Sequence, residues 1–168
     1  MAEPTRLKQP NYLKLLMQIL VSLAICFLAA AVAGMVTEPN IGWYETLKKP
    51  SFNPPDWIFG PVWTLLYTTM AGALFWVWRT DAPDEEKQPA YRWFAAQLIL
   101  NVLWSVAFFQ MQSPLLGTLD AVLLLIAICG TVAAFWRLSR GAALLLVPYL
   151  LWVMFATVLT FSLWRLNG

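Results

Sequence analysis

Hydrophobic positions along the chain fall into five long runs that are separated by short polar or proline-containing connections. The runs cover approximately residues 15–36, 57–78, 93–110, 115–136 and 142–164. Each is close to the roughly 20 apolar residues that a helix needs to cross about 30 Å of hydrocarbon. No run alternates with the period of two that is typical of a membrane barrel strand. The pattern predicts an all-α membrane protein, with residues 1–168 forming a single domain built as a five-helix transmembrane bundle.

The residues between the runs are typical of helix ends and loops. Ser113 followed by Pro114 places a favoured N-cap residue before a favoured first helical residue, so the fourth helix is predicted to begin there. Residues 137–141 leave so little chain between the fourth and fifth runs that these helices must be antiparallel neighbours. Residues 81–89 carry acids and prolines and are predicted to form a solvated loop. The first run ends in an alanine-rich stretch that imitates a signal-peptide cleavage site, but the run is long for a signal peptide, which favours a retained helix.

The basic residues predict an orientation, because the cytoplasmic loops of membrane proteins are enriched in Lys and Arg. Of the 11 basic residues, eight fall in the N-terminal segment and the second and fourth loops, and three fall in the first loop, third loop and C-terminal segment. The eight are Arg6, Lys8, Lys14, Arg79, Lys87, Arg92, Arg137 and Arg140, and the three are Lys48, Lys49 and Arg165. This bias predicts an integral multi-pass protein of the bacterial cell membrane with its N-terminus in the cytoplasm.

Composition agrees with a membrane protein and narrows the chemistry. The chain is 60% hydrophobic and 12% charged, against about 45–50% and about 25% in soluble domains. A net charge of +2 offers no basic surface for nucleic acid. The chain has no His, which removes imidazole bases and imidazole ligands, and no metal site is predicted. Cys26 and Cys129 lie inside apolar runs and are interpreted as small buried hydrophobic residues.

The first loop, residues 37–56, is long and rich in aromatic residues. Loops beyond about 12–15 residues are usually functional or disordered, and this one is too aromatic to be disordered. Trp43 and Leu47 are spaced to share one face of a short helix that is predicted to end at Pro50. The loop is either a lid over the bundle or an interfacial segment whose aromatic rings lie among lipid headgroups.

Tryptophans occur both near the ends of the runs and in their middles. Those near the ends fit the aromatic belt of a membrane protein, and they are Trp76, Trp78, Trp93, Trp136 and Trp164. Trp104 and Trp152 lie near mid-membrane, where the indole N–H needs a partner. These two side chains are candidates for something other than the belt.

Polar and aromatic side chains form a stripe along the third run. Gln97, Asn101, Trp104 and Phe108 lie on one helix face by their spacing. Amide side chains are costly against lipid, so this face is predicted to point into the bundle, either as contacts between helices or as polar groups of a cavity. A similar stripe in the second run contains Trp63, Tyr67 and Met70, and in the fifth run Pro148 is predicted to kink the helix that carries Trp152 and Ala156.

The sequence allows two or more roles for Asp120 and for several small residues. Asp120 lies inside the fourth run and is either the partner of a neighbouring helix or part of a ligand pathway. Small residues at a spacing of four allow close approach of helices, within the bundle, in a dimer, or in both. The pairs are Ala29/Ala33, Ala30/Gly34, Gly117/Ala121 and Gly130/Ala134.

Three stretches of the chain resemble the TspO/MBR family, which contains the bacterial tryptophan-rich sensory proteins and the mitochondrial translocator protein. They read WYETLKKPSFNPPDWIFGPVWTLLY at 43–67, AAQLILNVLWSVAFF at 95–109 and PYLLWVMFATVL at 148–159. The resemblance extends over residues 12–167, and three motifs in the same order make it specific. It implies a five-helix transmembrane bundle, commonly a homodimer, whose pocket is closed by the first loop acting as a lid.

The ligands of that family imply what the pocket binds. They are tetrapyrroles such as protoporphyrin IX and haem, sterols in the mitochondrial branch, and synthetic isoquinoline and benzodiazepine compounds. Matched to this sequence, the family's pocket residues imply ligand-binding roles for Tyr44, Trp57, Trp63, Asn101, Trp104, Ser105, Trp152 and Ala156. Phe161 and Ser162 stand where the sterol-recognition motif of animal members places a tyrosine before Arg165, so tetrapyrrole binding is favoured over sterol transport.

Three functions remain as alternatives. The first is the binding, sensing or transport of a tetrapyrrole whose propionates are held by Lys48 and Lys49, with no cofactor required and no axial ligation of haem by the protein. The second is light-dependent porphyrin breakdown, to which some family members are linked, with Trp57 and Trp152 as redox-active indoles. The third is a regulatory membrane subunit whose aromatic interior is only core. Family members occur in both bacterial and mitochondrial outer membranes, so an outer-membrane location stays an alternative to the cell membrane.

Overall fold

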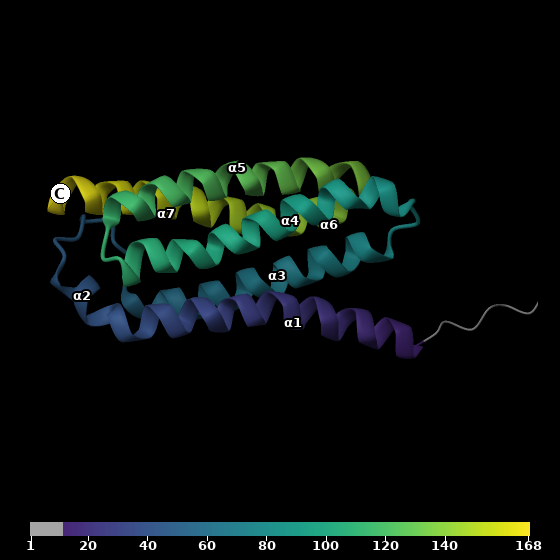
Figure 1. The fold of residues 1–168 in the computed structure, drawn as a ribbon, viewed down its shortest axis with the longest axis horizontal. Helices are drawn as coiled ribbons and strands as arrows, with labels where there is room; N and C mark the ends of the chain where they lie inside the picture. The colour runs from purple at the N-terminus through teal and green to yellow at the C-terminus, as the bar shows by residue number, and fades with distance from the viewer. Residues whose placement is uncertain (1–11) are drawn as a thin grey trace, which may run out of the picture.

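The computed structural model of the chain describes residues 12–168, and in this part every regular element is a helix. The long helices run side by side along one axis (Figure 1). They are α1 (Tyr12–Thr37), α3 (Phe59–Arg79), α4 (Asp84–Ser105), α5 (Pro114–Leu138) and α7 (Val147–Asn167). Five helical stretches are long and apolar enough to cross a membrane. The predicted all-α transmembrane bundle is therefore confirmed. Arg6 and Lys8, which contributed to the orientation prediction, lie outside the described residues.

The first loop folds into short helices at one end of the bundle. After α1 come the 3-10 turn η1 (Glu38–Asn40) and the helix α2 (Ile41–Thr46), and a second 3-10 turn, η2 (Asp56–Ile58), leads into α3. The short helix predicted around Trp43 is present, but it ends at Thr46 and not at Pro50. Leu47 already has extended backbone, with φ −73° and ψ 144°, because the chain there turns to meet the end of α7. We call residues 38–58 the lid and this end of the bundle the lid end.

Helix α4 begins at Asp84, well before the predicted start near residue 93. The prediction of a solvated loop is wrong for residues 84–89, although Thr80 to Pro83 do form a connection. Acidic side chains fill the first turn of α4, where carboxylates are favoured by the unpaired backbone N–H groups and the helix dipole. Their low hydropathy concealed helical residues that extend beyond the apolar run.

The regular α-helix is interrupted in both the fifth run and the third run. The fifth run divides at Leu146 into α6 (Arg140–Leu145) and α7, with Pro148 in the first turn of α7. The predicted effect of Pro148 is thus a break rather than a bend in one helix. Helix α4 continues into a π-helical segment, η3 (Val106–Gln110), before the chain turns into α5. The Ser113 side chain accepts a hydrogen bond from the backbone N–H of Leu116 at 3.3 Å, as its predicted N-cap role requires.

The main core lies between α3, α4, α5 and the start of α7, away from the lid. Phe94 of α4 stacks on Phe135 of α5 with ring centroids 5.8 Å apart, and Met70 and Ile128 are fully buried nearby in the same cluster. A second, smaller cluster at the lid end contains Tyr44 and other residues. Large apolar side chains also cover the outer surface, which fits a surface that contacts lipid acyl chains.

The small residues noted in the sequence have two different roles. Gly117 and Gly130 of α5 accommodate aromatic rings of η3 and α4, because an added Cβ would lie 2.7 Å from Cδ2 of Phe108 or 2.6 Å from Cδ2 of Trp93. Gly34 of α1 faces open space, since nothing lies within 4 Å of the position its Cβ would take. The first two allow close packing of α4 against α5, whereas Gly34 leaves room.

Replacing Gly117 with alanine is expected to destabilise the protein. The added Cβ would lie 2.9 Å from Cβ of Phe108, whose side chain is 1% exposed and has little room to move, and overpacking of this kind costs about 1–3 kcal/mol. Gly34→Ala is the matched control, because it meets no atom and gains up to about 1 kcal/mol of helix propensity. Thermal unfolding in detergent should show a lowered midpoint for Gly117→Ala alone, and equal midpoints for the two variants would contradict this account of the packing.

Candidate functional site

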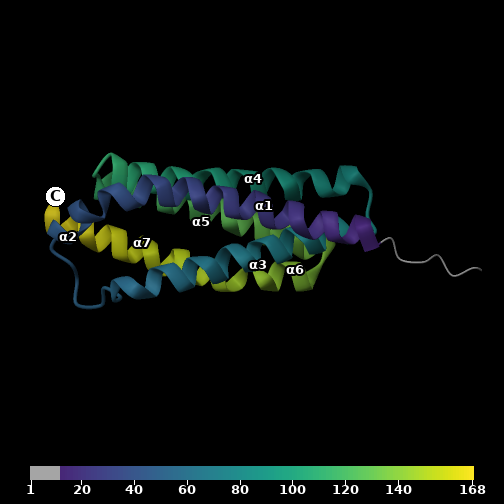
Figure 2. The same cartoon turned by 90° about the horizontal axis from the view of Figure 1, so that it is seen from below.

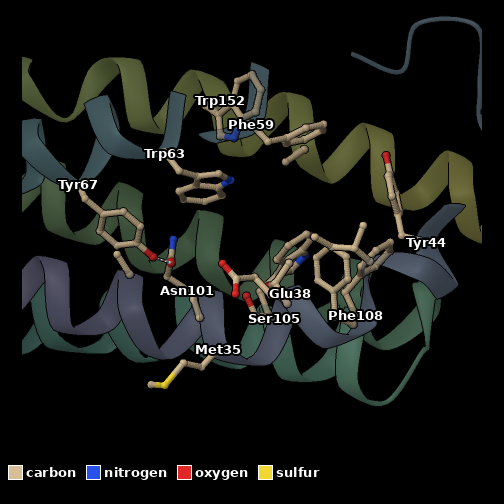
Figure 3. A pocket seen from close by; sticks show the side chains of 18 of the residues that line it. Met35, Glu38, Tyr44, Phe59, Trp63, Tyr67, Asn101, Ser105, Phe108 and Trp152 are labelled. Carbon is tan, nitrogen blue, oxygen red and sulfur yellow. Dashed lines mark hydrogen bonds between the residues drawn. The ribbon is translucent and has the colours of Figure 1, made fainter. Parts of the chain in front are cut away.

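A cavity of about 620 Å³ opens at the lid end of the bundle. Its walls come from α1, α3, α7, the end of α4 with η3, and the lid. Figure 3 shows aromatic side chains from several of these elements turned toward a common space. Figure 2 shows α2 and the C-terminal end of α7 at the same end of the bundle, and Lys48, which follows α2, is hydrogen-bonded to Asn167 of α7. The long first loop therefore covers part of a cavity, as the lid interpretation expects.

Seven of the eight predicted binding residues line this cavity. They are Tyr44, Trp63, Asn101, Trp104, Ser105, Trp152 and Ala156. Trp57 is the exception, because it is absent from the lining and its side chain is 75% exposed. The 3-10 turn η2 directs Trp57 outward, while its neighbours Asp56 and Phe59 line the cavity. Of the two tryptophans suggested for redox chemistry, Trp152 alone borders the cavity.

A hydrogen-bonded triad closes the inner end of the cavity. The Tyr67 hydroxyl of α3 donates to Oδ1 of Asn101 at 2.5 Å, and Nδ2 of Asn101 donates to the Tyr149 hydroxyl of α7 at 2.9 Å. All three residues are at least 96% buried. Tyr67 and Asn101 line the cavity, whereas Tyr149 lies behind them in the core. One amide thus joins three helices, and the triad uses one of its two N–H groups.

Aromatic rings form two opposed walls. On the α4 side, Trp104 stacks in parallel on Phe108 with centroids 5.1 Å apart and an interplanar angle of 5°. On the α7 side, Trp152 packs against Phe59, with centroids 5.9 Å apart, and against Phe155. Within the described residues, the buried indole nitrogen of Trp104 has no hydrogen-bond partner. The walls therefore offer flat apolar faces to the cavity, while the Trp104 N–H is buried behind them.

The lid is held by polar contacts to its own chain and to α7. The Tyr44 hydroxyl donates to Oδ1 of Asn53 at 2.7 Å. The side chain of Asn167 accepts from the backbone N–H of Lys48 at 2.8 Å and donates to the Lys48 carbonyl at 3.0 Å. The Lys49 ammonium lies 4.2 Å from the centroid of the Tyr44 ring. These contacts fix Tyr44 over the cavity and fasten the lid to the C-terminal end of the bundle.

The charges at the cavity differ from those expected from the sequence. Lys48 and Lys49 were predicted to face a ligand, but neither belongs to the lining. Lys48 contributes only backbone groups to the lid contact, and Lys49 is engaged with Tyr44. The charged lining residues among those described are the acids Glu38 and Asp56. The order of residues in the loop gave no indication of which side chains turn inward.

Other lining residues were not identified from the sequence. Phe59 and Phe109 border the cavity, and Phe109 reaches it because the π-helical segment η3 adds a residue to the turn after Ser105. Ala30 and Gly34 were interpreted as contacts between helices, yet they also line the cavity. The spacing of small residues could have indicated that α1 borders the cavity. The sequence has no recognisable pattern that predicts the π-helical segment.

Two polar residues of the sequence analysis do not belong to the cavity. Gln97 is 1% exposed and absent from the lining, and neither of its amide atoms has a hydrogen-bond partner in the described part of the chain. The predicted stripe on α4 is therefore divided: Asn101, Trp104 and Phe108 face the cavity, and Gln97 lies deeper. Asp120 is half-buried outside the lining, and its Oδ2 likewise has no partner among residues 12–168.

Asn101→Leu is expected to lower the free energy of unfolding by about 2–6 kcal/mol, because two buried tyrosine hydroxyls lose their partner at about 1–3 kcal/mol each. Replacing both partners as well, in Asn101→Leu/Tyr67→Phe/Tyr149→Phe, should recover much of the loss, since it removes the unpaired groups. Denaturant or thermal unfolding in detergent compares the variants. A triple variant no more stable than Asn101→Leu would show that the hydrogen bonds do not link these helices.

Asn167→Ala is expected to loosen the lid without unfolding the bundle. It removes both hydrogen bonds to the backbone of Lys48, whereas Lys48→Ala retains them and is the matched control. Amide hydrogen exchange of residues 47–53 should become faster in Asn167→Ala, while exchange in α4 and α5 stays unchanged. Faster exchange of the lid in both variants would instead assign the effect to the Lys48 side chain.

Comparison of the sequence with known proteins identifies a matching family and several relatives. The family model described as TspO/MBR family matches residues 22–165. The "Tryptophan-rich protein TspO" of Chlorobaculum tepidum is 48% identical over 153 residues, covering 88% of this chain and 97% of the relative. The "Tryptophan-rich sensory protein" of Cereibacter sphaeroides is 36% identical over 87% of this chain and 92% of the relative. The human "Translocator protein" is 35% identical over 84% of this chain and 83% of its own length.

The match covers most of α1 and α7, the other long helices, the lid and the residues that line the cavity. The family model and the sequence identity to its members therefore show that the chain belongs to the TspO/MBR family.

Proposed function

We propose that the cavity at the lid end binds a tetrapyrrole, such as protoporphyrin IX or haem, for sensing or transport in the membrane. The observation that carries this proposal is the pair of aromatic walls formed by Trp104 with Phe108 and by Trp152 with Phe59. A flat apolar macrocycle gains most from aromatic faces, which bind through area and offset stacking. The cavity volume of about 620 Å³ lies within the range of about 300–1,000 Å³ typical of small-molecule sites.

Polar groups at the inner end support orientation of such a ligand. Asn101 retains an amide N–H that the triad does not use, and Ser105 contributes a hydroxyl to the lining. A few polar groups in a mostly apolar pocket are the usual means of fixing a ligand's orientation. Because the chain has no His, binding is proposed to rest on contacts with the faces and edges of the macrocycle rather than on ligation of iron.

Names of the relatives agree with a role in signalling or movement of a ligand. Curated relatives are called a tryptophan-rich sensory protein and a translocator protein. The lid is held by a few polar contacts and by the small hydrophobic cluster at the lid end, which is separate from the main core. Such a lid suits a protein that admits and releases its ligand, because it can open without disturbing the main core. Sensing and transport both need this reversible access.

Trp152→Leu is expected to weaken binding of protoporphyrin IX about fivefold, since loss of one aromatic contact costs about 0.5–1.5 kcal/mol beyond buried area. Trp57→Leu is the matched control, because Trp57 is exposed and outside the cavity. Affinity is measured in the dark from the absorption band of the porphyrin, so that loss of a tryptophan does not alter the signal. No saturable binding to the native protein, or equal weakening by both substitutions, would contradict the proposed site.

A further inference from the structure

A second hollow lies at the end of the bundle opposite the lid. It is a groove of about 560 Å³ between the C-terminal end of α3 and the connection from α5 to α6, and Figure 1 shows these segments at the other end of the bundle from α2. The lining residues are Phe75, Trp76, Arg79, Thr80, Leu138 and Ser139. We call this hollow the α3–α6 groove. It shares no lining residue with the cavity at the lid end, so the two are separate.

The α3–α6 groove lies at the depth of lipid headgroups. Arg79 is the last residue of the second candidate membrane span, and Ser139 directly precedes the last span, which begins at Arg140. Trp76 and Trp136 are exposed near these span ends, as is typical of side chains at a membrane interface. Lipid phosphates therefore surround the groove in any bilayer that the protein spans, and the bilayer itself brings the ligand to the site.

The groove offers hydrogen-bond donors that suit a phosphate group. The guanidinium of Arg79 lies 5.9 Å from the centroid of the Phe75 ring, and in the described part of the chain it forms no ion pair with a carboxylate. The Ser139 hydroxyl oxygen accepts a hydrogen bond from the backbone N–H of Ala142 at 3.4 Å, which leaves the hydroxyl proton available for donation. Arginine is the side chain best suited to bind phosphate, because its planar fork donates two parallel N–H bonds.

Positive charge predominates beside the groove. Arg137 and Arg140 come directly before and after the two lining residues of the α5–α6 connection, and both are exposed. Asp81 is close to Arg79 in sequence, but it forms no ion pair within residues 12–168. The acids of α4 at this end occupy its first turn, and α4 contributes no lining residue. An anionic headgroup gains more from these arginines than a zwitterionic one, because the latter carries its own cation.

Close packing fixes the shape of the groove. An added Cβ at Gly141 of α6 would lie 3.2 Å from Cη2 of Trp76, so the tryptophan ring packs directly on the backbone of α6. The Thr80 hydroxyl donates to the Trp76 carbonyl at 3.2 Å, which satisfies a carbonyl in the last turn of α3. Two walls are thus held in place before a ligand arrives, and a preformed site loses less entropy on binding.

We infer that the α3–α6 groove binds the phosphate of an anionic phospholipid, with Arg79 and Ser139 as its donors. The acyl chains lie along the apolar outer surface of the bundle, where Leu144 of α6 is 56% exposed. The lipid joins the end of α3 to the start of α6 at the headgroup level. This site is independent of the cavity at the lid end and does not rest on its proposed function.

Native mass spectrometry of the delipidated protein tests the site with phosphatidylglycerol and phosphatidylcholine of identical acyl chains. The native protein is expected to prefer phosphatidylglycerol, and Arg79→Gln should reduce the ratio of the two association constants about fivefold, the contribution of one basic residue near a membrane surface. Arg79→Lys keeps the charge but loses the planar fork, so its ratio should lie between the two. Thermal unfolding without added lipid should give equal midpoints for all three proteins, since Arg79 is exposed.

Arg92→Gln is the matched control, because Arg92 is an exposed arginine in the N-terminal half of α4 and lies outside the groove lining. Its ratio should equal that of the native protein. An unchanged ratio in Arg79→Gln, or an equal fall in Arg92→Gln, would overturn the site and assign any lipid preference to the general charge of this end. Excess glycerol 3-phosphate should leave phosphatidylglycerol bound, because it lacks the acyl chains; its displacement of the lipid would overturn the assignment to a phospholipid.

Discussion

The side chain of Asn101 is the constraint on which the arrangement of the helices depends. An amide in the middle of a transmembrane helix has no water to bond, so hydrogen bonds to neighbouring helices stabilise it strongly. Asn101 finds Tyr67 on α3 and Tyr149 on α7, and the two hydroxyls are satisfied by the same bonds. This fixes the rotation of three helices about their axes. The same rotation turns Trp104 and Ser105, which follow Asn101 on α4, toward the cavity.

The lid end and the main core are held together by different sets of contacts. The main hydrophobic cluster lies away from the lid, and the small cluster around Tyr44 and Phe108 is separate from it. The lid contacts α7 through the hydrogen bonds between the Asn167 side chain and the backbone of Lys48, and also through apolar packing, which includes the rings of Phe52 and Phe155 with centroids 6.4 Å apart. Breaking them exposes little of the main core, so opening the lid costs much less than unfolding a helix. Stability of the bundle and access to the cavity are therefore carried by separate sets of interactions.

Sequence reasoning succeeded where one physical cause dominates. The bilayer imposes a length and an apolar composition on each span, and these predicted the five long helices; the lining residues Trp104 and Trp152 stood out because tryptophan is unusual at mid-membrane depth. It failed where local backbone geometry or tertiary contact decides. The turn η2 rotates Trp57 outward, and the ring of Tyr44 draws Lys49 away from the ligand side. Neither effect produces a periodic pattern in the sequence from which it could be predicted.

Small residues on α1 show why the same spacing has two meanings. A small residue indicates that something can approach the backbone, but the neighbour decides whether anything does. Opposite Gly117 the ring of Phe108 fills the space, whereas opposite Gly34 no atom lies within reach of a Cβ. Gly34 thus contributes volume to the cavity, whereas Ala30 both lines the cavity and packs against the main core. The volume of the cavity depends on the small residues of α1, which have no large side chains to fill it. The chemical character of the cavity depends on the aromatic and polar groups of α4, α7 and the lid.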